Sequence, residues 1–190
     1  MSSSKQTFKR PLKILLFTNS IILLAGAMFA PIYALYVEKV GGDLLDASLA
    51  GGVFALAAGI VTLASGRFTD KVKESELIVI LGYIIMGVGF LLYIICNSIW
   101  FLLFIQVMVG FGEAIYSPAF DALYSKHLDK TKSGKQWGAW ESINYFTLAL
   151  GAVIGGVIVT YFGFNVLFII MAIISLLSAI YIYLLPRKVL

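Results

Sequence analysis

The sequence holds few of the side chains on which soluble enzymes and secreted modules depend. Its 190 residues include one cysteine, Cys96, one histidine, His127, and only 13% charged residues, about half the share found in ordinary soluble domains. A single cysteine forms no internal disulfide, and a single histidine supplies neither a metal cluster nor a catalytic triad. These absences exclude a soluble enzyme and a disulfide-stapled module, and we expect no metal or other cofactor.

Apolar residues, by contrast, make up 61% of the sequence. They form six stretches, each of about 20 residues or more, the length of a helix that crosses a bilayer. The stretches are residues 14–37, 44–68, 77–96, 99–124, 138–162 and 166–185. We therefore expect an all-α membrane protein in which residues 1–13 and 186–190 flank a bundle of six transmembrane helices over residues 14–185. No separate soluble domain is expected.

Basic residues alternate between the two ends of these spans. Thirteen of the fourteen lysines and arginines lie before span one, after spans two, four and six, and only Lys39 lies on the other side. The positive-inside rule places the thirteen in the cytoplasm. The net charge of +4 thus reflects topology rather than nucleic-acid binding. We expect a multi-pass protein of the inner (plasma) membrane with both termini cytoplasmic; a cleaved signal peptide, the competing interpretation of the first span, would break this alternation.

The chain also resembles itself at an offset of 87 residues, which aligns span one with span four. In this alignment Ala27 meets Ala114 and Pro31 meets Pro118. Each copy has three spans, so the second copy enters the membrane from the opposite side. The pattern predicts a three-plus-three inverted repeat, over residues 14–96 and 99–185, an arrangement that many transporters use.

Several motifs occur in an order typical of one transporter family. They are Gly66-Arg67-Phe68-Thr69-Asp70-Lys71 after span two, Gly110, Gly112, Ala114 and Pro118 in span four, Trp137-Gly138, Gly151 and Gly155-Gly156 in span five, and Gly163-Phe164 before span six. On these residues the sequence resembles the N-terminal six-helix half of the major facilitator superfamily. The resemblance implies half of that fold and a cytoplasmic gate at Gly66, Asp70 and Lys71, to which we add Asp121.

Three departures from the family pattern qualify this resemblance. Glu74 and Ser75 stand where the family usually has basic residues, and Gly156 stands where antiporters of the family often carry proline. Antiport is therefore not supported by that motif. The family also has twelve spans as a rule, whereas we count six.

Polar side chains inside the spans predict a central cavity. A charge within a span costs about 2.5–3.5 kcal/mol on insertion scales, so such residues face protein or water and mark function. We place nine residues on the cavity wall: Asn19 and Tyr33 in span one, Gln106, Glu113, Tyr116 and Ser117 in span four, and Glu141, Asn144 and Tyr145 in span five. The family resemblance agrees, because it implies that spans one and four line the substrate path.

The three acidic residues within the spans each have two interpretations. Glu113 is either a site for a proton or substrate, since low dielectric favours a neutral carboxyl group, or a protonated side chain hydrogen-bonded to Gln106 or Asn19. Asp121 either forms an ion pair with Arg67 or Lys71 or takes part in transport. Glu141, one turn into span five, either stabilises the helix N-terminus or acts in gating.

The predicted function is secondary active transport of a small solute by alternating access, with proton coupling through Glu113 as a hypothesis. The sequence lacks a phosphate-binding loop for ATP, so a gradient would supply the energy, and we expect no enzymatic activity. The alternative is a non-transporting membrane subunit, or a truncated fragment of such a transporter, that packs against another protein.

The charged residues inside the spans predict that the chain assembles with a partner, because six helices supply only one wall of a cavity around Glu113. We expect a C2 homodimer in which span two of one chain packs against span five of its partner. Small residues at helical spacing would meet there: Gly51, Ala55 and Gly59 from span two, and Gly151 and Gly155 from span five. A separate six-helix protein as partner, or a longer chain of which this is a piece, are the alternatives.

Overall fold

The structure, a computed structural model, describes residues 8–69, 72 and 74–186. The described part of the chain is helical and contains no strand. In order it forms α1 (Arg10–Phe29), the 3-10 helix η1 (Ala30–Ile32), α2 (Tyr33–Lys39), α3 (Leu44–Thr69), α4 (Ser75–Ile94), α5 (Ile99–His127) and α6 (Ser133–Leu184). Five helical segments are long and apolar enough to cross a membrane, with α1 to α2 counted as one. The prediction of an all-α membrane protein is confirmed.

The first membrane-spanning segment is broken at Pro31. Proline has no N–H to donate and its ring collides with the carbonyl group one turn back, so an α-helix does not pass through it unchanged. The chain forms the short 3-10 helix η1 around Pro31, and α2 then continues to Lys39. Pro118, the counterpart of Pro31 in the repeat, lies inside α5 without ending it.

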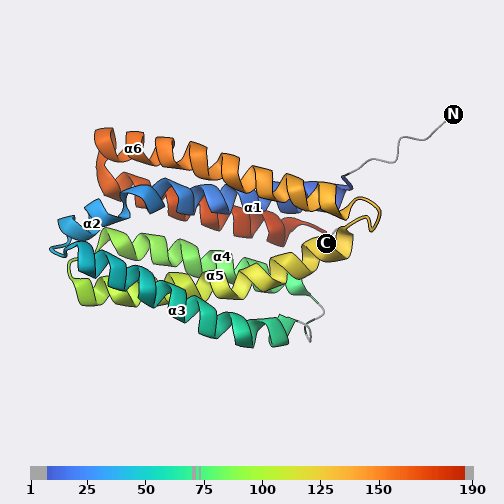
Figure 1. The fold of residues 1–190 in the computed structure, drawn as a ribbon, viewed down its shortest axis with the longest axis horizontal. Coiled ribbons are helices and arrows are strands. Elements are labelled where there is room, and N and C mark those ends of the chain that lie inside the picture. Colours follow the sequence, from blue (N-terminus) through green and yellow to red (C-terminus); the bar gives the residue numbers. More distant parts are fainter. Residues whose placement is uncertain (1–7, 70–71, 73, 187–190) are drawn as a thin grey trace.

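The α6 helix, 52 residues long, folds back on itself at Gly163. This glycine has φ 80° and ψ 172°, a conformation that lies outside the helical region and that side chains with a Cβ rarely adopt. The two arms, residues 133–162 and 164–184, run antiparallel in Figure 1. At 1.5 Å per residue they are about 45 Å and 31 Å long, so each is long enough to cross a hydrocarbon core of about 30 Å.

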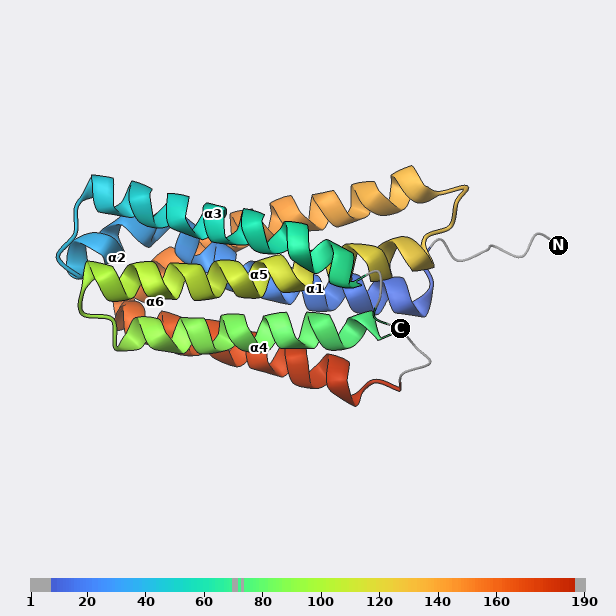
Figure 2. The same ribbon diagram turned by 90° about the horizontal axis from the view of Figure 1, so that it is seen from below.

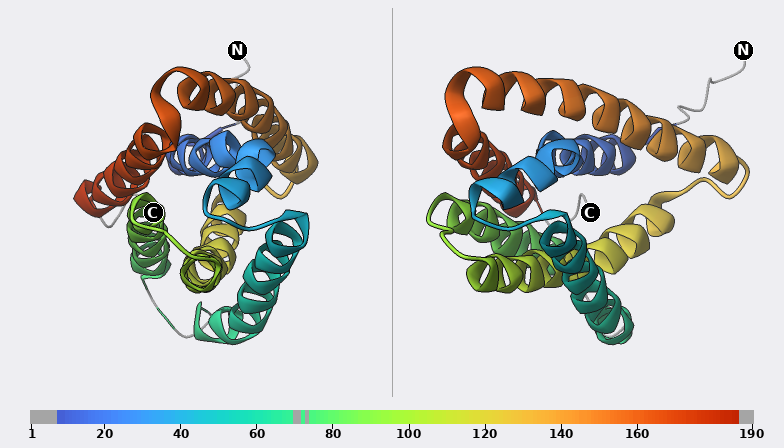
Figure 3. Two further views of the ribbon diagram at one scale, coloured as in Figure 1. Left: turned by 90° about the vertical axis from the view of Figure 1, so that its left-hand side faces the viewer. Right: turned by 60° about the vertical axis from the view of Figure 1, so that its left-hand side comes forward.

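Each long helix packs against one or two of the others. The α1 helix packs on α6, α3 packs on α5, and α4 packs on both α5 and α6. Figure 2 shows α4 beside α5 along the length of the molecule. Seen from one end (Figure 3, left), α1 and α5 occupy the middle, α3 and the first arm of α6 diverge on one side, and α4 and the second arm of α6 lie on the other.

Glycines allow the closest helix contacts, and they correct one expectation about assembly. Gly151 and Gly155 are buried against α1: a Cβ on Gly151 would lie 2.6 Å from that of Ala27, and one on Gly155 would overlap the Met28 carbonyl group. These two glycines are therefore used inside the chain and are not available to a partner. Gly51, Ala55 and Gly59 of α3 are exposed, as expected, and a Cβ on either glycine would have no neighbour within 4 Å.

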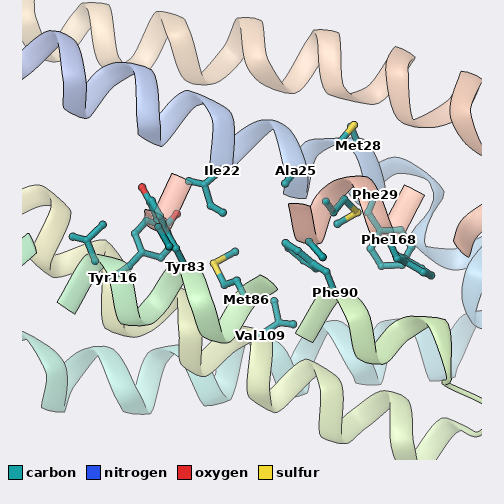
Figure 4. Close-up of a cluster of buried hydrophobic side chains, with 14 of the residues drawn as sticks. Ile22, Ala25, Met28, Phe29, Tyr83, Met86, Phe90, Val109, Tyr116 and Phe168 are labelled. Carbon is teal, nitrogen blue, oxygen red and sulfur yellow. The ribbon is translucent and has the colours of Figure 1, made fainter. Parts of the chain in front are cut away.

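An aromatic cluster holds α2 against the end of the bundle. The Tyr36 hydroxyl donates a hydrogen bond to the Tyr93 carbonyl oxygen at 2.6 Å. The Tyr36 ring lies 4.9 Å from that of Phe168 and 5.5 Å from that of Phe29. Figure 4 shows Phe29 and Phe168 in this cluster. Cys96, expected at the end of span three, lies beyond α4 in the turn to α5, where its Sγ is 3.6 Å from the Ser98 carbonyl oxygen.

Basic side chains of the described residues gather at one end of the molecule. The start of α1 with Lys9 and Lys13, the end of α3 with Arg67, and the connection from α5 to α6 all lie at the right of Figure 1, whereas Lys39 lies at the left. Lys5, Lys71, Lys73, Arg187 and Lys188 lie outside the described residues.

Candidate functional site

Three adjoining hollows lie along α1 and α5, and Glu113 lines all of them. We name them by their chemistry. The aromatic hollow has a volume of about 370 Å³, the middle hollow about 230 Å³ and the polar hollow about 190 Å³. Glu113 lies near the middle of α5 and is half-buried. A carboxyl group in a span is thus open to three neighbouring spaces.

The aromatic hollow has apolar wall residues from five helices and lies toward the α2 end of the molecule. Its apolar wall consists of Phe29 from α1, Phe54 from α3, Met86, Phe90 and Tyr93 from α4, Val109 from α5 and Met171 from α6. Figure 4 shows Phe29, Met86, Phe90 and Val109 side by side. Its polar groups are Tyr33, Gln106 and Glu113. This hollow therefore offers a large apolar surface around one carboxyl group.

The polar hollow lies on the other side of Glu113, toward the basic end. Asn19 from α1, Ser117 and Asp121 from α5, and Trp140 and Asn144 from α6 line it together with Tyr116. The middle hollow connects the two, with Gly26 and Asn144 on its wall. Polar groups from three helices thus converge on one side of α5.

Two residues that line these hollows carry a buried polar atom without a well-placed hydrogen-bond partner in the described part of the chain. Tyr33 lines the aromatic hollow and Trp140 lines the polar hollow, but the Tyr33 hydroxyl and the Trp140 indole N–H are themselves covered by protein atoms, and neither has a hydrogen-bond partner of good geometry. A buried donor without a partner costs about 1–3 kcal/mol.

The structure brings together most of the nine residues predicted for the cavity wall. Seven line the hollows: Asn19, Tyr33, Gln106, Glu113, Tyr116, Ser117 and Asn144. Glu141 and Tyr145 do not line any of the three, and both are exposed on α6. The hydrogen bond expected from Glu113 to Gln106 or Asn19 is not formed, because the Glu113 carboxyl group has no partner among the described residues.

Sequence reasoning missed the apolar half of the site. Met86, Phe90 and Tyr93 recur at the three- and four-residue spacing of one helical face, but every span of this chain is apolar, so that spacing carries no distinguishing signal. Trp140 was missed for a different reason. It was not part of the polar stripe, although its indole N–H is a hydrogen-bond donor.

The expected gate motif is only partly described. Gly66 is half-buried near the end of α3, and Asp70 and Lys71 lie outside the described residues. Asp121 and Arg67 form no ion pair in the described part of the chain, and the expected pairing of Asp121 with Arg67 or Lys71 stays a prediction. Two residues before Arg67, the Ser65 hydroxyl donates to the Ala114 carbonyl oxygen at 2.6 Å and joins α3 to α5.

The connection from α5 to α6 fixes the angle between the two helices that line the polar hollow. The Tyr124 hydroxyl donates to the Gln136 carbonyl oxygen at 2.6 Å, and the Asp129 N–H donates to the Gln136 side chain at 2.9 Å. The Thr131 hydroxyl and N–H both donate to the Asp129 carboxylate, at 2.7 Å and 3.0 Å, and these bonds lower the pKa of Asp129.

Within the residues that the structure describes, no group of three histidine, cysteine, aspartate or glutamate side chains is placed to hold a metal ion. The site consists instead of the Glu113 carboxyl group, shared by an apolar and a polar space, and the Asp121 carboxyl group in the polar space alone. A carboxyl group in such a position can bind a proton or a positively polarised group of a solute.

Comparison with known proteins identifies relatives. Residues 15–189 match the sequence profile of the Major Facilitator Superfamily. Two uncharacterised MFS-type transporters of Methanocaldococcus jannaschii are 24% and 27% identical, each over 90% of this chain and 44% of the relative. Multidrug resistance protein MdtG of Dickeya zeae is 25% identical over 92% of this chain and 43% of the relative. The chain therefore spans less than half the length of these relatives.

Proposed function

Because this chain belongs to the Major Facilitator Superfamily, a family of transporters and not of enzymes, we propose that it forms a six-span half of a secondary active transporter with a solute site at Glu113. The observation that carries this proposal is the position of Glu113, which lines three adjoining hollows within the apolar part of the molecule. An acidic residue in a span is costly unless it faces protein or water. The hollows provide that environment.

The proposed half consists of two inverted copies of three spans. The six spans are α1 to α2, α3, α4, α5 and the two arms of α6. Ala27 of α1 packs on Gly151 of α6, and its counterpart in the repeat, Ala114 of α5, accepts a hydrogen bond from Ser65 of α3. Ser65 corresponds to residue 152 in the second copy, next to Gly151. Span one therefore contacts span five, and span four contacts span two. Corresponding pairs of spans are thus in contact in both copies, which supports the repeat.

Transport would proceed by alternating access. The aromatic hollow has α3 on its wall and the middle hollow has the first arm of α6, the two segments that diverge in Figure 3 (left). Rocking of this half against a second one would open the hollows to one side of the membrane at a time. The energy would come from a gradient, with Glu113 as the group that takes up and releases a proton. We place the basic end of the molecule, and hence both termini, in the cytoplasm of a multi-pass inner-membrane protein.

The open face needs a cover, since the hollows would otherwise expose Glu113 to lipid. We propose that a second copy of this chain provides it. Two copies with the same orientation in the membrane can meet as parallel halves around an axis along the membrane normal. The exposed Gly51–Ala55–Gly59 face of α3 would pack on α6 of the partner. Because Gly151 and Gly155 are buried against α1, other residues of α6 would form this contact, and Leu148, which lines the middle hollow, lies on that side.

Alternating access is tested with a cysteine at Gly26. This residue lines the aromatic and middle hollows, and a Cβ there meets no atom within 4 Å. In a Cys96→Ser background, we expect Gly26→Cys to react with a membrane-impermeant maleimide both in right-side-out and in inverted vesicles. Val88→Cys, on the exposed outer face of α4, is the control and should react from neither side.

Labelling of Gly26→Cys from one side only, under all conditions tested, would contradict alternating access. Labelling from neither side would show that the hollows are filled or closed to water, and would also contradict the proposal.

A further inference from the structure

We propose that a groove between α1 and the first arm of α6 binds an anionic phospholipid, with the phosphate at Lys13 and an acyl chain along the apolar wall. The groove has a volume of about 410 Å³, and its lining includes Lys13, Phe17 and Ser20 of α1 and Phe146 and Leu150 of α6. None of its lining residues lines the three hollows around Glu113. The groove is therefore separate from the proposed solute site.

The groove opens on the outer side of the contact between α1 and α6. Two residues turn a helix by about half a turn, so Phe17 lies on the side of α1 opposite to Asn19, which lines the polar hollow. Phe146 lies in the same way on the side of α6 opposite to Asn144. Phe17, Phe146 and Leu150 are 59%, 67% and 61% exposed. In a bilayer this surface contacts lipid.

Positive charge gathers at one end of the groove. Lys13 is exposed in the first turn of α1, and the exposed Lys9 and Arg10 precede it by one turn. Residues one turn apart lie on the same face of a helix, where like charges repel. This end belongs to the basic end of the molecule (Figure 1), which we place in the cytoplasm. A phosphate at the membrane surface would relieve the repulsion.

Two acidic residues lie on segments next to the groove, and neither lines it. Glu141 precedes a residue of the groove by two positions, so it lies on another side of α6. Asp129, in the connection from α5 to α6, accepts hydrogen bonds from Thr131, and these bonds, with a smaller effect of nearby lysines such as Lys9, lower its pKa. Among the described residues, Lys13 thus has no opposite charge in the groove.

An anionic phospholipid fits both parts of the groove. Basic pockets between spans at the cytoplasmic side are suited to anionic head groups, and the wall beyond Lys13 is apolar, since the Ser20 hydroxyl already donates to the Phe17 carbonyl oxygen at 2.8 Å. A zwitterionic lipid also carries a phosphate, but its own cation would find no carboxylate among the residues that line the groove. A helix of another protein would cover the apolar wall and leave Lys13 without an anion.

The test uses an introduced tryptophan as a reporter of the lipid next to it. The three native tryptophans are replaced by phenylalanine. Phe146→Trp then places an indole in the groove, and Val88→Trp places one on the exposed outer face of α4. The purified full chain is reconstituted with lipids whose brominated acyl chains quench tryptophan fluorescence. For Phe146→Trp we expect phosphatidylglycerol to bind about fivefold more tightly than phosphatidylcholine, and for Val88→Trp we expect no preference.

Two pairs of variants separate the charge from the shape of the groove. Lys13→Gln should abolish the preference for phosphatidylglycerol at Phe146→Trp. Lys39→Gln, the same change of charge at the other end of the molecule, should preserve it. Ser20→Phe adds a ring to the groove and should also reduce the preference, whereas Ser48→Phe, at an exposed position of α3, should not.

A second measurement uses the chain with its own tryptophans, so it does not depend on how well the reporter variants fold. A ligand that binds only the folded state raises the unfolding temperature, and a lipid that bridges α1 and α6 acts in this way. Added phosphatidylglycerol should therefore raise the unfolding temperature in detergent more than phosphatidylcholine does. Lys13→Gln should lose this difference and Lys39→Gln should keep it.

Equal binding of the two lipids at Phe146→Trp, or a preference that survives Lys13→Gln, would overturn the lipid site. The same preference at Val88→Trp would also overturn it, because it would show a general attraction of anionic lipid to a basic chain. Absence of quenching at Phe146→Trp by either lipid would mean that protein covers the groove, and the proposal would be wrong. These measurements contain no solute and no gradient, so their failure would leave the transporter function untouched.

Discussion

Two glutamates of this protein, Glu113 and Glu141, differ in whether their side chains line a hollow. Glu113 and Glu141 are both glutamates inside apolar segments, and polarity alone assigns both to a cavity. In the structure Glu113 lines three hollows, whereas Glu141 lies exposed on α6. The difference arises from the rotation of α6 against α1, which is set by the contacts of Gly151 and Gly155 with Ala27 and Met28.

Asp129 permits a prediction at the residue scale. Its pKa is lowered by hydrogen bonds from the Thr131 hydroxyl and N–H. Thr131→Val removes the hydroxyl donor and keeps the N–H, so the pKa of Asp129 should rise toward its ordinary value, as NMR of a selectively labelled sample would measure. Because the folded-state pKa is lowered, these bonds stabilise the connection above the unfolded-state pKa and are lost as pH falls through the folded-state pKa. An unchanged pKa would contradict this account.

At the scale of helices, sequence reasoning found the spans and missed how they end and turn. The apolar runs predict α3 and the start of α5 closely, because a long apolar run surrounded by charges has one physical solution in a bilayer. The break at Pro31 was not predicted, although proline chemistry provides a reason for it. The exposed and buried sides of α6 could not be predicted either. Beyond its first turns the helix is almost entirely apolar, and its polar residues Glu141 and Asn144 differ in exposure only because of how α6 contacts α1.

Adjacent glycines in α6 provide a matched test of helix packing. Gly155 touches the Met28 backbone, whereas a Cβ on Gly156 would meet no atom within 4 Å. Gly155→Ala should therefore push α1 and α6 apart and destabilise the fold by about 1–3 kcal/mol, the usual cost of overpacking. Gly156→Ala should be neutral or slightly stabilising, because alanine favours helix. Thermal unfolding in detergent, followed by size-exclusion chromatography, compares the two; equal stabilities would contradict the packing described here.

At the scale of the whole molecule, the open face between α3 and the first arm of α6 governs the proposed assembly. Introduced cysteines at Ala55 and Leu148, in a Cys96→Ser background, should form disulfide-linked dimers through the proposed α3–α6 interface. A pair at Val88 and Ile173, exposed on α4 and the second arm of α6, is the control and should remain monomeric. In the contrary outcome, the first pair and its neighbours form no disulfide-linked dimer while Gly26→Cys is still labelled from both sides. That result would contradict the homodimer and would mean that a different six-helix protein or segment covers the hollows.

The central claim is that Glu113, within hollows open to alternate sides, couples a proton to solute movement. The most direct measurement is the ratio of Gly26→Cys labelling in right-side-out and inverted vesicles, in acidic and in alkaline buffer. The ratio cancels the pH dependence of the thiol reaction itself. We predict that it changes with pH in the parent and in an Asp121→Asn variant, and that Glu113→Gln removes the change. A Glu113→Gln variant with the same pH-dependent ratio as the parent would contradict the claim.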